Sequence, residues 1–363
     1  MEGVGVEPDF WRGRRVLLTG HTGFKGSWLA LWLESLGAEV AGLSNGVPTT
    51  PSLFELARVG EGVASIECDV RDAQAVERAI AESRPEIVIH MAAQSLVRRS
   101  FERPVDTYAT NVMGTVHVLD AARRDDAVEV VLNVTSDKCY ENREWVWGYR
   151  ERDPMGGHDP YSNSKGCAEL VTAAFRSSYG QEGGGPAIAS ARAGNVIGGG
   201  DWAEDRLVPD VMQAALEGRP AVIRNPDAIR PWQHVLNPLS GYLTLVQALS
   251  RSHEHAEAWN FGPEDADVRP VRWVVDRLGE AWGEPIAWRQ HEGEEPHEAR
   301  HLKLDSSKAR ARLGWAPTWP LGDALVSIAA WYRALSAGAD LRRHALDQIA
   351  AFQAGEAPPR AAS

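Results

Sequence analysis

The sequence predicts an α/β fold, a Rossmann-like doubly wound parallel sheet with a smaller mixed α/β C-terminal lobe. Three observations indicate this fold. In the first half, short apolar segments alternate with amphipathic segments of helical spacing. A glycine-rich turn follows the first apolar segment, and beyond residue 193 glycine and proline become frequent. Because strand, helix and strand in series join by right-handed crossovers, the first half should form one parallel sheet.

The elements of the first half follow from this alternation. Strands are expected at residues 15–19, 39–43, 63–68, 86–91, 128–135 and 187–192. Helices are expected at residues 24–36, 106–122 and 161–179. Gly37 is a natural C-cap for the first helix. In the second helix, Tyr108, Val112, Val116 and Leu119 lie near helical spacing.

The second half is expected to divide between the sheet and the lobe. Helices are expected at residues 208–217, 234–249, 271–282 and 321–335, and short strands at 221–224, 259–261 and 285–288. The first domain should cover residues 10–193, with residues near 234–262 returning to it, and the lobe mainly residues 194–335. Residues 1–9 and 355–363 are expected to be disordered.

Charge and composition narrow the class of protein. A net charge of -12 argues against nucleic acid or anionic membranes as partners. No apolar run approaches the length of a membrane span, and residues 1–9 lack the pattern of a secretory signal. Cys68, Cys139 and Cys167 have no metal-binding spacing and leave one cysteine unpaired. We therefore expect a cytoplasmic protein without a metal site.

A glycine-rich loop is the first candidate site. Its residues are Gly20, His21, Thr22, Gly23, Phe24, Lys25 and Gly26. Backbone without Cβ atoms can approach a pyrophosphate at a helix N-terminus, where free N–H groups favour anions. A plain tight turn is the alternative, but the loop follows a strand and opens a helix, which is the context of a dinucleotide site.

Further candidate cofactor residues end the third and fourth strands. They are Asp69, Val70, Ala92, Ala93 and Gln94. Asp69 either accepts a hydrogen bond from an adenine amino group or caps the helix that begins near residue 72.

The second strand ends at Ser44 and Asn45, without an acidic residue that would distinguish NAD from NADP. His21 and Lys25 make the loop bulky, so a loosely held cofactor is a hypothesis that an NAD titration can test.

A second candidate site combines a helix and a strand end. Tyr161 and Lys165 are four residues apart, on one face of a helix. A neighbouring cation lowers the pKa of a tyrosine and makes its phenolate a usable base. The fifth strand runs into Ser136, Asp137 and Lys138 at the same edge of the sheet. A helix face with a merely buried tyrosine fits this joint context less well.

Over residues 14–331 the chain resembles the extended short-chain dehydrogenase/reductase family, in its NAD-dependent epimerase/dehydratase branch. The resemblance implies NAD as cofactor, with Ser136, Tyr161 and Lys165 in hydride chemistry and Asn111 supporting the lysine. It also implies a homodimer through helices 106–122 and 161–179.

The residues after Ser136 resemble the dehydratases of that family. In these enzymes an acid for C6 and a base for C5 of a hexose follow the strand's serine or threonine. Asp137 and Lys138 stand there, where the dTDP-glucose enzymes usually have Asp-Glu. The lysine resembles the CDP-glucose branch, as do the blocks at residues 21–28, 192–202 and 230–235. The alternative for Lys138 is a solvated charge at a strand end.

The resemblance implies 4,6-dehydration of a nucleotide sugar, with CDP-glucose as the expected substrate, in deoxysugar synthesis for surface polysaccharide. Tyr161 would take the C4 hydroxyl proton while hydride passes to NAD, and Ser136 would bind the developing ketone. Lys138 would then remove the C5 proton while Asp137 protonates the departing C6 hydroxyl. Hydride returns to C6. For this, Lys138 has to be partly neutral and Asp137 partly protonated, so we expect coupled titration.

The diphosphate of such a substrate needs local cations in this acidic chain. Arg230 matches the family's phosphate-binding arginine, and Arg206 is the second candidate. Asn195 is expected to bond to the diphosphate or the sugar, and His297 matches a family position near the nucleotide. Ser95 is placed to approach sugar hydroxyls. For Arg206 and His297, a surface ion pair or a solvated side chain stays open.

Three other functions compete with this expectation. They are a dehydratase for another nucleotide sugar such as dTDP-glucose or GDP-mannose, a 4-epimerase, and a non-catalytic NAD-binding protein on the same fold. An epimerase has no use for Asp137 and Lys138. Intact Ser136, Tyr161 and Lys165 argue against lost catalysis.

Overall fold

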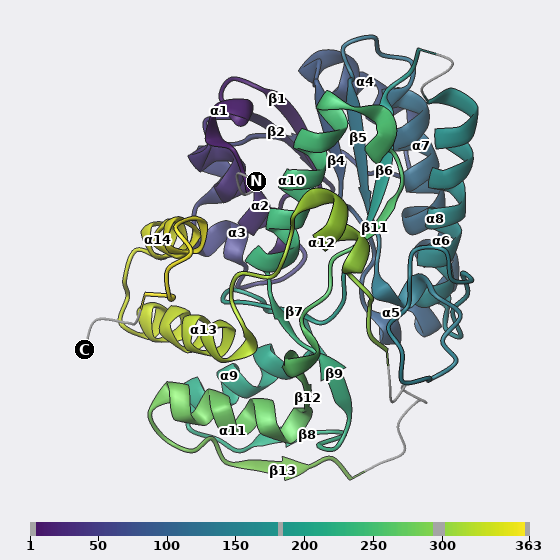
Figure 1. Ribbon diagram of the computed structural model, residues 1–363. Coiled ribbons are helices and arrows are strands. Elements are labelled where there is room, and N and C mark those ends of the chain that lie inside the picture. The colour runs from purple at the N-terminus through teal and green to yellow at the C-terminus, as the bar shows by residue number, and fades with distance from the viewer. Residues whose placement is uncertain (1–4, 181–183, 293–301, 360–363) are drawn as a thin grey trace.

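A parallel sheet forms the centre of the larger part of the protein, and a smaller lobe lies at one end (Figure 1). The computed structural model describes residues 5–180, 184–292 and 302–359. The sheet contains β1 (Arg15–Thr19), β2 (Glu39–Ser44), β3 (Ala64–Glu67), β4 (Ile87–His90), β5 (Val130–Val134), β6 (Ala187–Arg192) and β11 (Ala258–Asn260). Their order is β11-β6-β5-β4-β1-β2-β3 and every pair is parallel. The predicted fold class is therefore confirmed.

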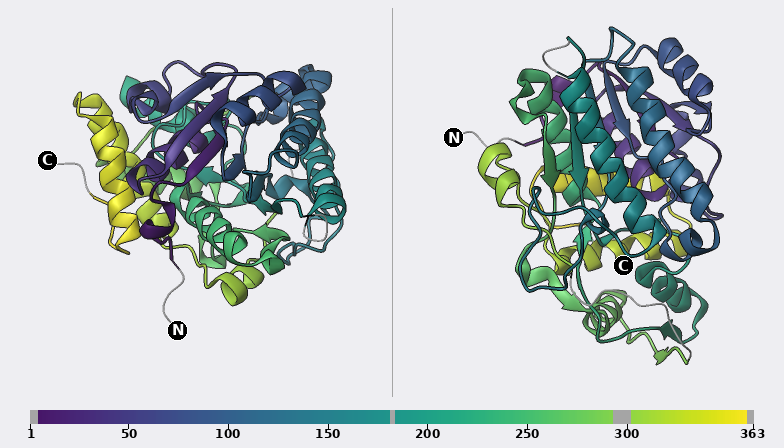
Figure 2. Two further views of the ribbon diagram at one scale, coloured as in Figure 1. Left: turned by 90° about the horizontal axis from the view of Figure 1, so that it is seen from above. Right: turned by 90° about the vertical axis from the view of Figure 1, so that its right-hand side faces the viewer.

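Helices cover both faces of the sheet because its strands are apolar on both sides. Val16 and Leu18 of β1 pack in the core with α2 (Phe24–Ser35) and α10 (Leu236–Arg251). Leu17, between them, packs on the opposite face with α4 (Ala73–Ser83) and α7 (Gly114–Ala122). α8 (Pro160–Tyr179) lies beside α7. The right-hand view of Figure 2 shows this blue-to-teal layer of helices in front of the sheet and the yellow C-terminal helices behind it.

The lobe consists of short strand pairs and helices. The strands pair as β7 (Val196–Ile197) with β10 (Gln233–His234), β9 (Ile229–Pro231) with β12 (Val268–Pro270), and β8 (Ala221–Ile223) with β13 (Trp288–Gln290). The helices nearest to them are α9 (Leu207–Glu217), α11 (Val271–Trp282) and α13 (Leu321–Ser336). The α13 helix, 16 residues long, packs against α11 of the lobe.

Several elements differ from the expectation. The predicted helix at 106–122 consists of α6 (Pro104–Tyr108), a π-helical turn (Ala109–Met113) and α7. The remaining helices were not expected: α1 (Pro8–Trp11), α3 (Leu53–Leu56), α5 (Val97–Glu102), α12 (Ser307–Leu313) and α14 (Leu341–Gln353). Most are too short to show a periodic pattern.

The expectation of disorder at both ends is wrong for the residues that the structure describes there. The Glu7 backbone N–H donates to Gln247 (3.0 Å), and α1 follows directly. The Glu356 carbonyl accepts from the indole of Trp319 (2.8 Å). Both ends are held because they bond to the large core. Residues 1–4 and 360–363 lie outside the described residues.

No helix among the described residues is long and apolar enough to cross a membrane. Within the same ranges, no group of three or more His, Cys, Asp or Glu side chains is arranged to hold a metal ion.

Candidate active site

The glycine-rich loop joins the carboxyl end of β1 to the first turn of α2. Gly20 has a φ of +77°, and a Cβ there would stand 2.9 Å from the Ala92 backbone. A Cβ on Gly26 would stand 2.1 Å from the Gly20 carbonyl oxygen. Gly23 is the N-cap residue of α2, and no side chain caps that turn. Bare backbone at a helix N-terminus fits the pyrophosphate of a dinucleotide.

The side chains of the loop bind to the protein itself. The Thr22 hydroxyl bonds to the Ser44 hydroxyl and the Gly46 carbonyl, both at 2.7 Å. His21 is buried against Gly42, and its Nε2 lies 2.9 Å from the Ser65 hydroxyl. These contacts tie the loop to the ends of β2 and β3. The loosely held cofactor stays a prediction.

Lys25 extends from the loop toward the second candidate site. Its Nζ donates to the Tyr242 hydroxyl (3.0 Å). Burial, together with the charges of Lys165 and Arg206, lowers the pKa of Lys25 to about 7, while Asp137 opposes the shift. Lys25 is thus close enough to these groups for their charges to shift its pKa. Its place in the glycine-rich loop did not predict that it lies near the second candidate site. Phe24 of the same loop lies against Gly198.

Asp69 does not cap a helix, so that alternative is wrong. The N-cap of α4 is Asp72, whose side chain accepts from the Ala75 N–H. Asp69 accepts from the Arg71 guanidinium at 2.6 Å and from Asn45 at 3.4 Å. The hydrogen bond from Arg71 lowers the pKa of Asp69, which is an ionised acceptor at the sheet edge.

The predicted cofactor residues Val70, Ala92 and Ala93 have apolar side chains, so mainly their backbone groups could contact a cofactor. The Val70 side chain is buried against Gly114, and its carbonyl oxygen lies 2.9 Å from His117 Nδ1. The Ala92 N–H donates to the Thr19 hydroxyl at 3.0 Å, and Ala93 follows, half-buried.

The Gln94 and Asn111 side chains hold the loop after β4. Gln94 Nε2 donates to the Leu96 carbonyl and the Thr107 hydroxyl. Asn111, in the π-helical turn, accepts from the Gln94 N–H (2.8 Å) and donates to the Ser164 hydroxyl (2.9 Å). Asn111 therefore contacts the residue next to Lys165, and its predicted support of the lysine stays a prediction.

Ser136, Asp137 and Lys138 converge at the carboxyl end of β5. They begin a single 3-10 turn (Asp137–Cys139) that Ser136 caps by accepting from the Lys138 N–H. The Ser136 hydroxyl donates to Asp137 Oδ1 (3.0 Å), and Lys138 Nζ lies 3.9 Å from the same oxygen. The Asp137 side chain is 1% exposed and that of Lys138 34%. The acid is enclosed, and the ammonium group reaches toward solvent.

Asp137 depends on a glycine that the sequence pattern did not single out. A Cβ on Gly194 would stand 1.9 Å from Asp137 Oδ2. That oxygen is buried and, among the described residues, has no hydrogen-bond partner. Gly194 follows β6, which pairs with β5, so the two strand ends meet only in the folded sheet.

Tyr161 lies among these groups, but its electrostatics differ from the expectation. Burial raises the pKa of Tyr161 above its ordinary value. The Lys138 ammonium, the Ser136 hydroxyl and the Arg206 charge oppose that shift, while Asp137 adds to it. The expected lowering of the Tyr161 pKa is therefore wrong, because burial outweighs the cations around the phenol.

Lys165 points to the end of the catalytic strand. Its Nζ donates to the Val134 carbonyl at 3.4 Å. Burial lowers the pKa of Lys165 to about 8, and the Glu169 carboxylate opposes this. The lysine is thus poised near neutral pH beneath the site.

Arg206 brings the lobe to the same cluster. Its guanidinium bonds to the buried Asp201 (2.9 Å) and to the Ser95 hydroxyl (3.4 Å). Asp201 raises the pKa of Arg206, and the guanidinium acts electrostatically on Tyr161. The Arg206 side chain is 34% exposed and its partner Asp201 only 4%, so this ion pair is partly buried.

The remaining substrate candidates lie in the lobe. Arg230 is buried on β9, where its Nη1 donates to the Ile229 carbonyl (2.9 Å). Asn195 is half-buried with a φ of +47°, directly after Gly194. His297 lies outside the described residues.

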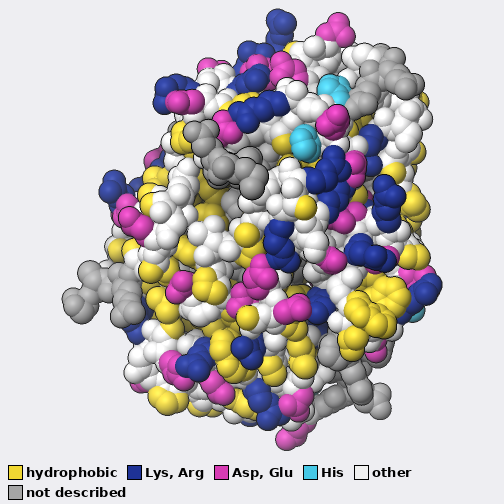
Figure 3. Space-filling view, viewed as in Figure 1, with side chains coloured by type: hydrophobic (Ala, Val, Ile, Leu, Met, Phe, Trp, Pro, Cys, Tyr) yellow, Lys and Arg dark blue, Asp and Glu magenta, His cyan; other side chains and the backbone are white. Residues whose placement is uncertain are grey.

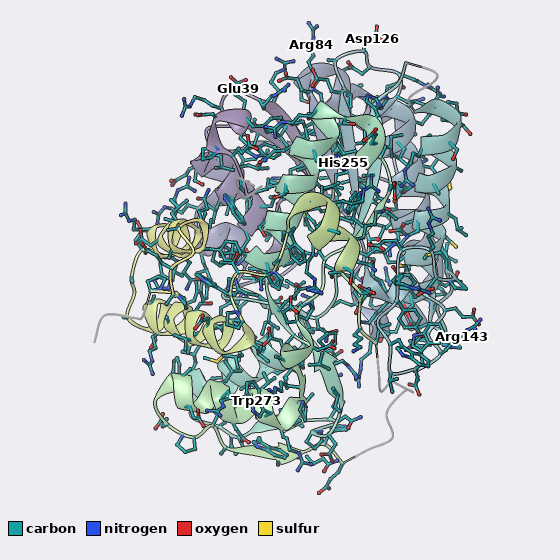
Figure 4. All side chains as sticks on the ribbon, in the orientation of Figure 1. Glu39, Arg84, Asp126, Arg143, His255 and Trp273 are labelled. Carbon is teal, nitrogen blue, oxygen red and sulfur yellow. The ribbon has the colours of Figure 1, made fainter. Side chains whose placement is uncertain are left out.

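The surface view gives the wider electrostatic setting. On the face in Figure 3, Lys and Arg side chains are intermixed with Asp and Glu. Figure 4 places Arg143, on the segment that follows the 3-10 turn, at the outer edge, and Trp273 of α11 in the lobe.

Comparisons with known proteins show which family the chain resembles in sequence. The profile of the GDP-mannose 4,6 dehydratase family matches residues 17–327. The CDP-glucose 4,6-dehydratase of Salmonella typhimurium is 53% identical over 341 residues, 93% of this chain and 95% of that protein. A dTDP-glucose 4,6-dehydratase of Xanthomonas campestris is 27% identical, over 87% of this chain and 92% of that protein.

Solved structures show the same architecture. The UDP-glucose 4-epimerase of Thermus thermophilus, in complex with NAD, matches with a TM-score of 0.76 and 26% identity, over 88% of this chain and 99% of that one. The dTDP-glucose 4,6-dehydratase DesIV of Streptomyces venezuelae matches in fold with a TM-score of 0.75 and 24% identity, over 90% of this chain and 99% of that one.

Proposed function

Because this chain belongs to the GDP-mannose 4,6 dehydratase family, a family of nucleotide-sugar 4,6-dehydratases, we propose that it converts CDP-glucose to CDP-4-keto-6-deoxyglucose and water. It is a hydro-lyase, and NAD is the cofactor of its family. One observation carries the choice of substrate: Lys138 follows the buried Asp137 beside Tyr161, in a chain 53% identical to a CDP-glucose enzyme.

NAD would supply the acceptor for a hydride from C4 of the sugar and, once reduced, the donor of a hydride to C6. The loop of Gly20, Gly23 and Gly26 would hold its pyrophosphate, and Asp69 would accept from its adenine amino group. Lys165 would contact the cofactor from α8. The backbone clearances of Gly20 and Gly26 and the ionised state of Asp69 support these assignments.

Residues that follow β5 and a residue in the first turn of α8 carry out the proton transfers. Tyr161 takes the C4 hydroxyl proton, and Ser136 donates to the oxygen that becomes a ketone. That ketone acidifies C5, from which Lys138 removes a proton, and Lys138 gives a proton back to C5 when the hydride reaches C6. Asp137 gives its proton to the departing C6 hydroxyl. The 3.9 Å between Lys138 Nζ and Asp137 Oδ1 supports an elimination in which base and acid act on adjacent carbons.

The raised pKa of Tyr161 adds a condition to the first step. The phenol is protonated in the resting protein at neutral pH, and its conversion to a base depends on the cations that oppose the effect of burial. Lys138 and Arg206 are those cations. Arg206 therefore serves two purposes, as a ligand for the substrate diphosphate and as a charge beside the phenol. Ser95, Asn195, Arg230 and His297 complete the proposed substrate site.

A product assay tests the proposal. The purified protein is incubated with NAD and, in separate reactions, with CDP-glucose, dTDP-glucose, GDP-mannose and UDP-glucose. The alkaline chromophore of a 4-keto-6-deoxy product is expected with CDP-glucose. Turnover of another sugar nucleotide alone would change the substrate. An epimerised sugar without water loss would indicate an epimerase.

We also propose a homodimer through the helices that carry the site. Large apolar side chains are exposed on α5, α6, the π-helical turn and α8: Phe101, Val105, Tyr108, Met113, Leu170 and Tyr179. Val105 is 79% exposed. Exposed apolar surface on adjacent helices is typical of a protein interface.

A cytoplasmic location is the last part of the proposal. Cys68, Cys139 and Cys167 are free thiols in the structure, as expected in a reducing compartment. The 4-keto-6-deoxy product is reactive at C3 and C4, so deoxysugar synthesis for surface polysaccharides, such as O-antigen, is its expected use.

A further inference from the structure

A buried carboxylate lies directly below the catalytic residues. Glu169, on α8, is 3% exposed. Its Oε1 accepts from the Thr135 hydroxyl (2.5 Å), and its Oε2 accepts from the Ser190 hydroxyl and from Arg192 Nη2 (both 2.7 Å). Three donors from two strands therefore converge on one helix residue.

These bonds connect the two halves of the active site. Tyr161, Lys165 and Glu169 lie at four-residue intervals and so share one face of α8. Thr135 directly precedes Ser136, at the end of β5. A shift of α8 along β5 would break the bonds to Glu169, so they fix the helix that carries Tyr161 and Lys165 against the strand that presents Ser136.

Packing alone does not require a charged side chain at position 169. Its partner Arg192 is also buried, and it donates to the Tyr140 hydroxyl (2.6 Å) and the Glu151 carbonyl (3.1 Å). Well-packed neutral residues often replace buried ion pairs without loss of stability. A role for the negative charge itself is therefore worth a test.

Lys165 is the group that this charge affects. Around Lys165 stand Glu169 on its own helix, Cys139 in the 3-10 turn, Lys25 on α2 and His90 on β4. Burial raises the pKa of Cys139 and lowers that of His90, so both are neutral near pH 7. Among these four, only Glu169 is anionic there and favours the lysine charge.

We propose that Glu169 is a positioning residue of the active site, which fixes α8 on the catalytic strand and keeps Lys165 in its ammonium form. This deepens the proposed function and rests on it for the activity measurement. Burial works against the ammonium form of Lys165, and the Glu169 carboxylate opposes that effect.

The test uses two variants and a matched control. Glu169→Gln removes the charge and keeps the shape. Glu169→Gln with Arg192→Gln removes both charges, so that no guanidinium is left buried and unpaired. Thr172→Val is the control, because Thr172 accepts from Asn133 at 2.7 Å and joins α8 to β5 without a charge. Each protein is melted, titrated with NADH by fluorescence and assayed for turnover, from pH 6 to pH 10.

Both Glu169 variants should lose NADH affinity and kcat at a lower pH than wild type, by about one pH unit, because a lysine without its anion deprotonates earlier. At pH 8 a shift of one pH unit should lower the ammonium fraction of Lys165, and kcat with it, about fivefold. Thr172→Val should lower the melting temperature and leave the pH profiles unchanged. Wild-type profiles in folded Glu169 variants would overturn the proposal. If wild type makes no product from CDP-glucose, the proposed function fails, while the NADH profiles still test Glu169.

Discussion

Gly194 has no Cβ, and this leaves room for the Asp137 carboxylate. Gly194→Ala puts a methyl group where Asp137 Oδ2 now lies, 1.9 Å from the new Cβ. We expect the displaced acid to slow the elimination by about 10- to 100-fold. Product formation, measured as the alkaline chromophore, reports this loss.

Gly322→Ala is the matched control for that substitution. A Cβ at Gly322, on α13, meets nothing within 4 Å. This change should leave turnover unaltered and raise stability by up to about 1 kcal/mol, since alanine favours a helix. Equal turnover in both variants would show that the Asp137 position does not matter.

Lys138 separates the two halves of the reaction. Lys138→Met should lower overall turnover by about 100- to 10,000-fold, because no other base is assigned to the C5 proton. Oxidation at C4 should persist at a reduced rate and appear as reduced NAD in the near ultraviolet. Loss of the lysine should also change the pH–rate profile.

An unchanged pH–rate profile in Lys138→Met would remove this lysine from the mechanism. Lys303→Met serves as the control, because Lys303 pairs with the exposed Asp265 (3.0 Å) in a different part of the chain. It should behave as wild type.

At the scale of an element, α8 matters most because it carries both Tyr161 and Lys165. Asp159 caps this helix by accepting from the Ser162 N–H (2.9 Å) and hydroxyl (2.5 Å), and Pro160 occupies its first turn. Asp159→Ala should cost about 1 kcal/mol of stability. It should also lower kcat, because the freed turn contains Tyr161.

Asp72→Ala tests whether that effect is local. Asp72 caps α4 in the same way, by accepting from the Ala75 N–H (3.0 Å), but α4 carries no proposed catalytic residue. A similar loss of stability, about 1 kcal/mol, is expected with normal kcat. Thermal melts and turnover of both variants make the comparison; equal kcat in both would separate the α8 cap from catalysis.

At the scale of the whole molecule, two buried histidines set the acid stability. Burial lowers the pKa of His90 and of His234 to about 3. Below the ordinary value of 6.5, the unfolded chain binds protons that the folded chain does not. Stability should therefore fall as the pH drops from 6.5 toward 3, by at most about 1.4 kcal/mol per pH unit for each histidine.

His234→Phe should flatten this dependence. The ring packs against Trp28 and Trp319, and its Nε2 is buried without a partner among the described residues. Phenylalanine keeps this packing and loses only the hydrogen bond that Nδ1 accepts from the Leu236 N–H (3.3 Å), so the melting temperature at neutral pH should change little. His253→Phe, at an exposed position, is the control. A slope that is the same in all three proteins would contradict the assignment.

The dimer is also a property of the whole molecule. Val105→Glu with Leu170→Glu places charges on two side chains that are 79% and 59% exposed in the single chain. Light scattering should show a dimer for wild type and a monomer for this variant. Val146→Glu, at a 72% exposed site on another segment, should remain dimeric. A monomeric wild type would refute the proposed interface.

The local sequence determined the strands of the sheet, the helices between them and the positions of Ser136, Asp137, Lys138, Tyr161 and Lys165. Periodicity and turn residues act over short distances, and neighbouring strand ends meet at one edge in any doubly wound sheet. The sequence did not predict the π-helical turn or α14, because packing contacts outweigh weak local preferences there.

The electrostatics of the site, and the side chains that meet there, depend on the complete fold. Burial raises the pKa of Tyr161, although the sequence places a lysine one turn away. Gly194 meets Asp137, and Glu169 meets Thr135 and Arg192, across separate strands. Desolvation and contact depend on what surrounds a group in space, and the sequence sets that only through the complete fold.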